Sequence, residues 1–368
     1  MDHQFAKQLQ SQMCAGTWNL LHNCTHLQPG EKLLLICEDP TLGWYDQKVA
    51  GTIMKAAKKF GVDPTIIHAG EPTNHPVPEI TDAIASHDCV IYLARLGDQS
   101  RFDDIAPGKR SVMCYVRDSN MLASPFCQTT YQATKAIKDA IDDVLLEAKT
   151  ITVTCPLGTN FTGSAQTVGQ VKKSDVSVFR FPLGVPQPLS AKHFSGKVAI
   201  SRYLTPTGSK VYKPACVPLL KTSFAHINQG RITGFEGDAD EVKVIEKHYE
   251  YIAEKFGIDR DIVHSWHAGI HPACAYMADA AENPDRWSNT VFGNPRIVHF
   301  HTCGDYAPAE ISWIVIDHTI TVDGQTLWDH GRLCLENFTK TAACLETWPE
   351  LKKLFANPVQ EIGVTDRS

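Results

Sequence analysis

The sequence lacks the features that mark membrane, exported or nucleic-acid-binding proteins. No stretch reaches the roughly 18 uncharged apolar residues that a membrane-spanning helix needs, and no uninterrupted apolar run follows the N-terminus. Lys and Arg number 35 against 41 Asp and Glu, a net charge of -6, so no basic excess is available to neutralise phosphates. We therefore expect a cytoplasmic protein with neither a membrane nor nucleic acid as a partner.

Two motifs with a defined chemistry are also missing. The 12 cysteines are spread along the chain without any C-x-x-C pair, which argues against a zinc knuckle or a disulfide scaffold. No G-x-G-x-x-G follows the first predicted strand, so a dinucleotide site has no support. We expect reduced thiols, and for Cys303, close to His301, a buried thiol rather than a nucleophile.

The first part of the chain alternates short buried runs with amphipathic segments of helical period. Predicted strands are 32–40 (KLLLICEDP), 64–70 (PTIIHAG), 88–95 (DCVIYLAR) and 111–118 (SVMCYVRD). Predicted helices are 49–62, 78–88 and 131–149. Strands separated by helices predict an α/β domain with a parallel sheet, which we assign to residues 1–150.

After residue 150 the pattern changes to short alternating segments broken by Gly, Pro and Asn, which is typical of antiparallel strands and hairpins. These segments are 150–158, 176–184, 197–204, 223–237 and 312–324. One helix is predicted over 240–257, with Asp238 or Asp240 as N-cap and Gly257 as C-cap. Residues 151–368 are therefore expected to form a strand-rich α+β catalytic domain.

Histidine carries the strongest chemical signal, since eight of the 16 histidines lie between residues 248 and 330. In the segment HSWHAGIHP, His264, His267 and His271 would share one face if the segment is helical. Such a face could bind a metal. Gly269 and Pro272 weaken the helix on which this arrangement depends.

A second group follows in VHFHTCGDYAPAEIS. His299 and His301 are two apart and share a face if this segment is a strand, with Asp305, Glu310 and Ser312 further along. Imidazole together with carboxylate suits zinc, manganese or non-haem iron, and leaves coordination positions open. The alternative for His299 is a hydrogen-bonded core residue.

Several stretches resemble the aminopeptidase T (M29) metallopeptidase superfamily, and within it the 2,5-dihydroxypyridine dioxygenase and 5-nitroanthranilate aminohydrolase branch. The stretches that carry the resemblance are VTCPLGTNFTG, FPLGVPQPLSAKHFSGKVAIS, ITGFEGDADEV, HSWHAGIHP and EISWIVIDHTITVDG. The resemblance covers most of the chain. It implies a metal-dependent enzyme with metal ligands in the C-terminal part, and a homo-oligomer.

The chain departs from the family at its ligand positions. Counted back from Asp323 and Gly324, the family's His-x-Asp pair falls on Glu310 and Ser312. The glutamate expected after FPxG is replaced at residues 185–187 (VPQ), and the Ser/Thr-Asp near the domain start is Thr159-Asn160. Either the metal has moved to a set such as His264 or His267 with His301 and Glu310, or the scaffold carries a different chemistry.

We expect a divalent-metal hydrolase (Fe2+, Mn2+ or Zn2+) acting on a small aromatic or heteroaromatic acid. The expected metal ligands are drawn from His264, His267, His301 and Glu310. The expected catalytic residues are Asp305 or Asp317 and Ser312, and the expected substrate-binding residues are Arg202, Arg296 and Trp266. Two alternatives remain open: a non-haem Fe(II) ring-cleaving dioxygenase, and a binding protein that has lost its metal.

Overall fold

The computed structural model describes residues 14–73, 75, 77–165, 177–304 and 309–364. The chain divides into two compact units, one of residues 1–135 and 176–183 and one of residues 136–175 and 184–368. The boundary expected at residue 150 differs from this division, because it falls inside the second unit, just after helix α8 (Tyr131–Glu147). Among the described residues, no helix is both long and apolar enough to span a bilayer.

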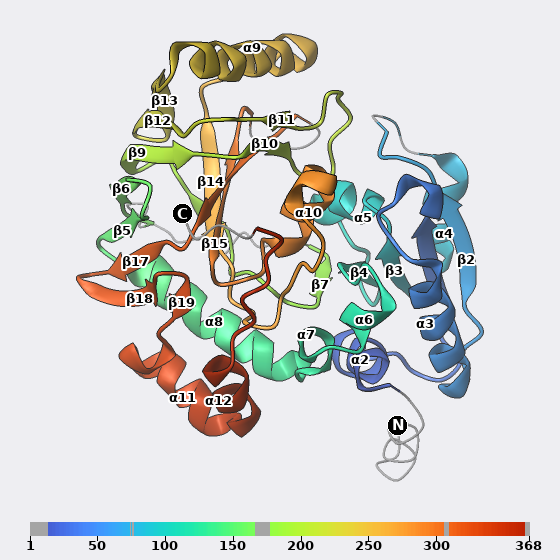
Figure 1. Ribbon diagram of the computed structural model, residues 1–368. Coiled ribbons are helices and arrows are strands. Elements are labelled where there is room, and N and C mark those ends of the chain that lie inside the picture. Colours follow the sequence, from blue (N-terminus) through green and yellow to red (C-terminus); the bar gives the residue numbers. More distant parts are fainter. Residues whose placement is uncertain (1–13, 74, 76, 166–176, 305–308, 365–368) are drawn as a thin grey trace. The chain divides into compact units, whose positions relative to one another are not determined.

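The first unit contains a parallel sheet, as the alternation of strands and helices predicted (Figure 1). Its strand order is β2-β1-β3-β4-β7. The strands are β1 (Leu33–Glu38), β2 (Thr65–Ala69), β3 (Cys89–Leu93), β4 (Arg110–Cys114) and β7 (Phe179–Phe181). Strands β1 to β4 confirm the four predicted strands, and all but the partly exposed β2 are buried runs.

Strand β7 corrects a prediction. The segment 176–184 was expected among the antiparallel strands of the second half, but β7 pairs in parallel with β4, Phe179 opposite Val112. The backbone N–H of Tyr115 also donates to the Phe181 carbonyl over 2.7 Å. The chain returns to the first unit here because β4 offers an open sheet edge and Phe181 is fully buried in that unit's core.

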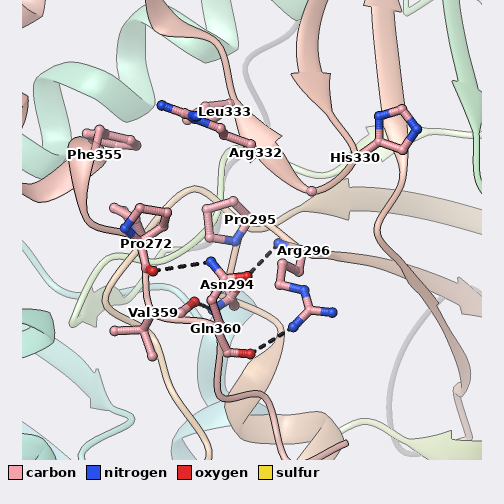
Figure 2. A pocket seen from close by; sticks show the side chains of 12 residues that line it. Pro272, Asn294, Pro295, Arg296, His330, Arg332, Leu333, Phe355, Val359 and Gln360 are labelled. Atoms are coloured by element: carbon pink, nitrogen blue, oxygen red, sulfur yellow. Dashed lines mark hydrogen bonds between the residues drawn. The ribbon is translucent and has the colours of Figure 1, made fainter. Parts of the chain in front are cut away.

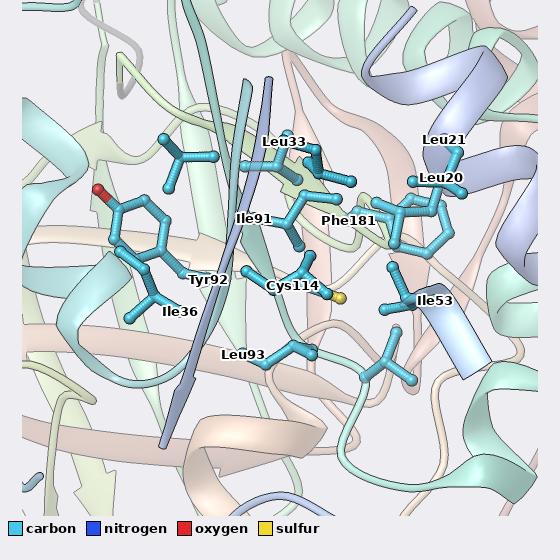
Figure 3. Packing of buried hydrophobic residues seen from close by; sticks show 14 of the residues in the cluster. Leu20, Leu21, Leu33, Ile36, Ile53, Ile91, Tyr92, Leu93, Cys114 and Phe181 are labelled. Carbon is cyan, nitrogen blue, oxygen red and sulfur yellow. The ribbon is translucent and has the colours of Figure 1, made fainter. Parts of the chain in front are cut away.

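The described residues of the first unit also form helices. They are α2 (Ala15–Trp18), η1 (Asn19–Cys24), η2 (Pro40–Leu42), α3 (Gln47–Lys59), α4 (Pro78–Ser86), α5 (Leu96–Gln99), η3 (Ser100–Phe102), α6 (Ser119–Leu122) and α7 (Pro125–Gln128). Figure 3 shows Ile53 of α3 in one core with Ile36 of β1 and Ile91 of β3. The Asp46 side chain caps α3 by accepting from the Lys48 N–H.

The second unit contains two antiparallel sheets. One has the order β11-β10-β16-β15-β14-β8 and is called here the six-stranded sheet; the other has the order β13-β12-β9-β6-β5-β17-β18-β19 and is called the eight-stranded sheet. The strands are β5 (Ile151–Thr154), β6 (Asn160–Gly163), β8 (Leu189–Ser190), β9 (Phe194–Ile200), β10 (Tyr203–Pro206), β11 (Val217–Pro218), β12 (Ser223–Asn228), β13 (Arg231–Glu236), β14 (Val263–Ala268), β15 (Ile297–Thr302), β16 (Ile311–Ile316), β17 (Thr319–Val322), β18 (Gln325–Asp329) and β19 (Arg332–Leu333).

Helices complete the second unit. Besides α8 they are α9 (Ala239–Phe256), η4 (Ala280–Glu282), α10 (Pro284–Val291), η5 (Leu335–Asn337), α11 (Thr339–Thr347) and α12 (Pro349–Ala356). Helix α9 confirms the predicted helix and both of its caps. The Asp238 side chain accepts from the Asp240 N–H, and Gly257 ends the helix at φ 64°, a left-handed conformation that glycine adopts without strain.

An aromatic layer joins the two sheets of this unit. Trp266 of β14 makes edge contacts with Phe161 and Phe194 of the eight-stranded sheet, with ring centroids 6.4 and 5.4 Å apart. Phe300 of β15 lies 5.5 Å from Phe161 and 5.9 Å from Trp313 of β16. This face of the six-stranded sheet therefore faces the interior of a sandwich.

Candidate metal centre

The other face of the six-stranded sheet gathers histidines from two neighbouring strands. His267 of β14 is the pairing partner of His299 on β15, and His301 of β15 is the partner of Ser312 on β16. Residues paired directly across antiparallel strands point to the same face, as do residues two apart on one strand. All four side chains therefore share a face, which we call the polar face.

Three of these side chains form one group, which we call the histidine group: His267, His299 and His301. Each offers a ring nitrogen, and these three nitrogens lie within 4.8 Å of one another. The Nε2 atoms of His267 and His301 are 3.2 Å apart. Two ligands bound to one zinc ion at about 2.0–2.1 Å and at tetrahedral angles lie about 3.3 Å apart. The Nε2 atoms of His267 and His301 are thus already about as far apart as two ligands of one ion. The His299 ring would have to move closer to them to bind the same ion.

His299 is the most unusual member of the group. Its side chain is 4% exposed, and neither ring nitrogen has a hydrogen-bond partner among the described residues. Burial lowers the pKa of His299 well below its usual value, and the neighbouring His301 lowers it further, while Glu310 opposes the shift. The ring is therefore neutral near pH 7, which is the form that binds a metal.

Glu310 and Ser312 lie beside the group. The Glu310 Oε1 atom is 3.4 Å from the Nδ1 of His301, the ring nitrogen other than the one facing His267. The Tyr212 hydroxyl donates to the Glu310 carbonyl over 2.7 Å and holds its backbone. The Ser312 hydroxyl is fully buried and, among the described residues, has no hydrogen-bond partner.

An apolar wall adjoins the histidines. The Phe292 ring centroid lies 6.2 Å from that of His267 and 6.3 Å from that of His299. Further along the same face, Ile297 and Ile314 pack against Trp287 of α10. The polar face is therefore a small polar area with an apolar border, which raises the strength of electrostatic interactions inside it.

The first group of histidines does not lie on a helix, so the shared helical face that would join His264, His267 and His271 does not form. Residues 263–268 form strand β14, so His271 lies beyond the strand and does not join His267. Its Nδ1 accepts the Ala273 N–H over 3.3 Å. His264 lies where the pairing of β14 with β15 is irregular, and its Nδ1 is 3.0 Å from the Ser265 hydroxyl. The structure brings together His267, His301, Glu310 and Ser312, but not His264.

Arg296, expected to bind substrate, and Asp317, expected to be catalytic, lie at the end of the β15–β16 pair that is away from His301. Arg296 precedes β15 and Asp317 follows β16, and they form a bidentate ion pair with distances of 2.6 and 2.8 Å. Arg202 stands at the start of β10, where its carbonyl accepts from the Leu219 N–H. None of these three adjoins the histidines in the described contacts. Asp305 lies outside the described residues.

The predicted substrate contact from Trp266 is also placed elsewhere. Its side chain is 1% exposed and belongs to the aromatic layer on the opposite face from the histidines. Cys303 is fully buried, and burial raises the pKa of its thiol to about 12. A thiol with this pKa stays protonated near neutral pH, so Cys303 is a poor nucleophile.

His299 belongs to the histidine group but was not among the metal ligands expected from the sequence. Its spacing of two from His301 already placed both rings on one strand face, but a core histidine was the alternative reading. The deciding signal is the register, which sets His267 directly opposite His299. That register depends on the fold and cannot be read from spacing alone.

A comparison with solved structures gives a similar fold. No protein-family model matches the chain and no curated protein matches it. The solved structure of 2,5-dihydroxypyridine dioxygenase from Pseudomonas putida KT2440 is similar, with a TM-score of 0.59 and 12% identity over 91% of this chain and 99% of that chain. Wild-type AmpT from Thermus thermophilus is also similar, with a TM-score of 0.47 and 11% identity over 90% and 99% of the two chains. At 12% identity, the likeness to the dioxygenase shows a shared fold.

Proposed function

We propose that the chain is a divalent-metal hydrolase whose ion is held by His267, His299 and His301, and that its substrate is a small aromatic or heteroaromatic acid. The observation that carries the proposal is the state of His299. A hydrogen bond between His267 and His301 would satisfy one nitrogen of each, yet it leaves both nitrogens of His299 buried and unpartnered among the described residues. Burying unsatisfied polar groups costs about 1–3 kcal/mol each, and a bound cation would remove that cost for the one nitrogen that coordinates it.

The donor set favours hydrolysis. When bound, a divalent metal held by three neutral imidazoles would lower the pKa of a coordinated water towards 7 and polarise the group under attack. A group of two histidines and one carboxylate is the set typical of oxygen-activating iron. Here the three ligand atoms that lie within 4.8 Å of one another all come from histidines.

Neighbouring residues take supporting roles. Glu310 lies at Nδ1 of His301, so it would accept that N–H and fix Nε2 as the lone-pair nitrogen, as outer carboxylates do in metal sites. The Ser312 hydroxyl would hold the attacking water by a hydrogen bond. Phe292 would offer an apolar surface for a ring.

The second candidate is an oxygen-dependent ring-cleaving enzyme. It is favoured by the fold, because the solved structure with a TM-score of 0.59 is named a dioxygenase. Both candidates use the histidine group and differ in whether turnover needs oxygen.

The test combines metal content with turnover. The protein, loaded in turn with Zn2+, Mn2+ and Fe2+ without oxygen, is assayed by elemental analysis and then screened with aromatic acids with and without oxygen. We expect about one ion per chain and turnover without oxygen. His299→Ala should lose the ion and the turnover, whereas His248→Gln, at a buried histidine of α9, should keep both.

The other possible results would select one of the alternative functions or overturn the proposed site. Turnover only with oxygen would select the dioxygenase. A wild-type chain that binds no ion in any condition, or a His299→Ala variant that keeps its ion, would overturn the proposed site and favour a metal-free binding protein.

A further inference from the structure

A second feature of the same unit lies away from the histidine group. A cavity of about 210 Å³ opens beside Arg296, at the start of β15 (Figure 2). His301 lies five positions further along this strand, which corresponds to about 16 Å. None of the three grouped histidines lines the cavity. It is therefore a separate place in the fold.

Basic groups dominate the polar lining of this cavity. Arg296, His330 and Arg332 contribute to it, and among the described lining residues none carries a carboxylate. Arg332 is exposed and, within the described part of the chain, has no ion-pair partner. The His330 Nδ1 lies 2.7 Å from Asp329, which is outside the lining. The cavity thus offers one unneutralised guanidinium.

Among the described residues, Arg296, unlike Arg332, is ion-paired. Its Nε and Nη2 atoms donate to Asp317, and Nη1 donates to the Gln360 carbonyl over 2.7 Å, a contact drawn in Figure 2. These contacts use three of its five N–H groups, so N–H donors remain although the charge is balanced. Arg296 supplies a fixed donor, and Arg332 supplies the charge.

Apart from Asn294, Gln360 and Gly331, the rest of the lining is apolar. Leu333, Phe355 and Val359 contribute, together with three prolines. Proline rings and aliphatic side chains offer no donors, and they suit a hydrophobic body of limited size. A strongly hydrated anion such as free phosphate would leave this surface unused.

We infer that this cavity binds a small organic carboxylate with an aromatic or aliphatic body, with the carboxylate on Arg332 and the body against Phe355. Guanidinium pairs with carboxylate through two parallel N–H bonds, which fixes the ligand's orientation. The volume limits the body to about the size of a single ring. This inference does not depend on the metal site.

The test is calorimetric titration with benzoate, using the full chain carrying His299→Ala so that the histidine group does not contribute. We expect saturable binding of one benzoate per chain, with a dissociation constant near or below about 1 mM. The neutral isostere benzamide should bind at least tenfold more weakly. Arg332→Gln should weaken benzoate binding at least tenfold, and Val359→Phe, which fills the cavity, should abolish it.

A matched control is Lys352→Gln, which removes an exposed cation of α12 outside the lining and should leave the affinity unchanged. Folding of each variant is checked by its thermal transition. Absence of saturable benzoate binding would overturn the inference. So would equal binding of benzoate by the wild-type, Arg332→Gln and Val359→Phe cavities, or equal binding of benzamide and benzoate.

Discussion

The two faces of the six-stranded sheet are both buried but differ in chemistry. One face carries Trp266, Phe300 and Trp313, which pack into the aromatic layer of the sandwich. The other carries the histidine group and Ser312. The same strands supply both faces through simple alternation, so neighbouring residues in sequence serve opposite purposes.

The difference shows where the fold gains and loses stability. Burial of large aromatic rings is favourable and needs no partner beyond packing. Burial of imidazole nitrogens without hydrogen bonds is unfavourable, and His299 has two such nitrogens among the described contacts. The proposed ion would satisfy one of these two nitrogens.

The largest effect is expected on the aromatic face. Trp266→Ala should lower the free energy of unfolding by about 3–5 kcal/mol, because it leaves a large cavity in the sandwich. The ion content per folded chain should remain normal, since Trp266 lies on the opposite face from the histidines. Urea unfolding and elemental analysis measure the two quantities. A fully stable variant that lost its ion would contradict the separation of the faces.

The next effect concerns Glu310. Glu310→Gln keeps the shape but removes the charge that lies 3.4 Å from His301 Nδ1, so metal affinity should fall about 10- to 100-fold, with folding retained. Competition with a chelator measures the affinity. A loss as complete as that of His299→Ala would make Glu310 itself a ligand, and an unchanged affinity would make it a structural residue only.

The next prediction concerns the pH dependence of stability at His248, a buried histidine outside the polar face. Burial lowers the pKa of His248 from 6.5 to about 4. The unfolded chain therefore takes up a proton first, so the stability that neutral His248 contributes is complete above pH 6.5 and is lost as the pH falls towards 4. Between pH 7 and 5 the wild type should lose about 2 kcal/mol more than His248→Gln. Urea titrations at the two pH values measure this difference, and parallel losses would contradict it.

The smallest effect is expected for His264. It lies on β14 with His267 but at the irregular pairing site, outside the group. His264→Gln should change metal affinity by less than about twofold and stability by about 0.5 kcal/mol or less, whereas His267→Gln should lose most of the affinity. The pair of variants is compared by the same chelator competition. Equal losses would place His264 at the ion.

Local signals predicted much of the fold. The buried runs of β1 and β3 and the capped helix α9 follow from patterns within a few residues. The parallel pairing of β7 was missed because it depends on the open edge of β4, far away in sequence. The three-and-four spacing of the histidines around His267 does not produce a helix, because this segment pairs with β8 and β15.

The grouping of side chains at the candidate site was also predicted only in part. His267, His301, Glu310 and Ser312 were placed in one site because of their residue types and the family resemblance. Arg296 and Asp317 were proposed for chemistry, but they neutralise each other at the other end of the strands, a pairing that only the three-dimensional fold defines. Spacing alone does not show which buried charge has a partner.

X-ray absorption spectroscopy of the zinc-loaded protein tests the central claim most directly, because it reports the atoms bound to the ion. We expect about three imidazole nitrogens at about 2.0–2.1 Å from the zinc, and fewer imidazoles for any ion that His299→Ala retains. A spectrum with oxygen ligands only, or one that His299→Ala leaves unchanged, would contradict it.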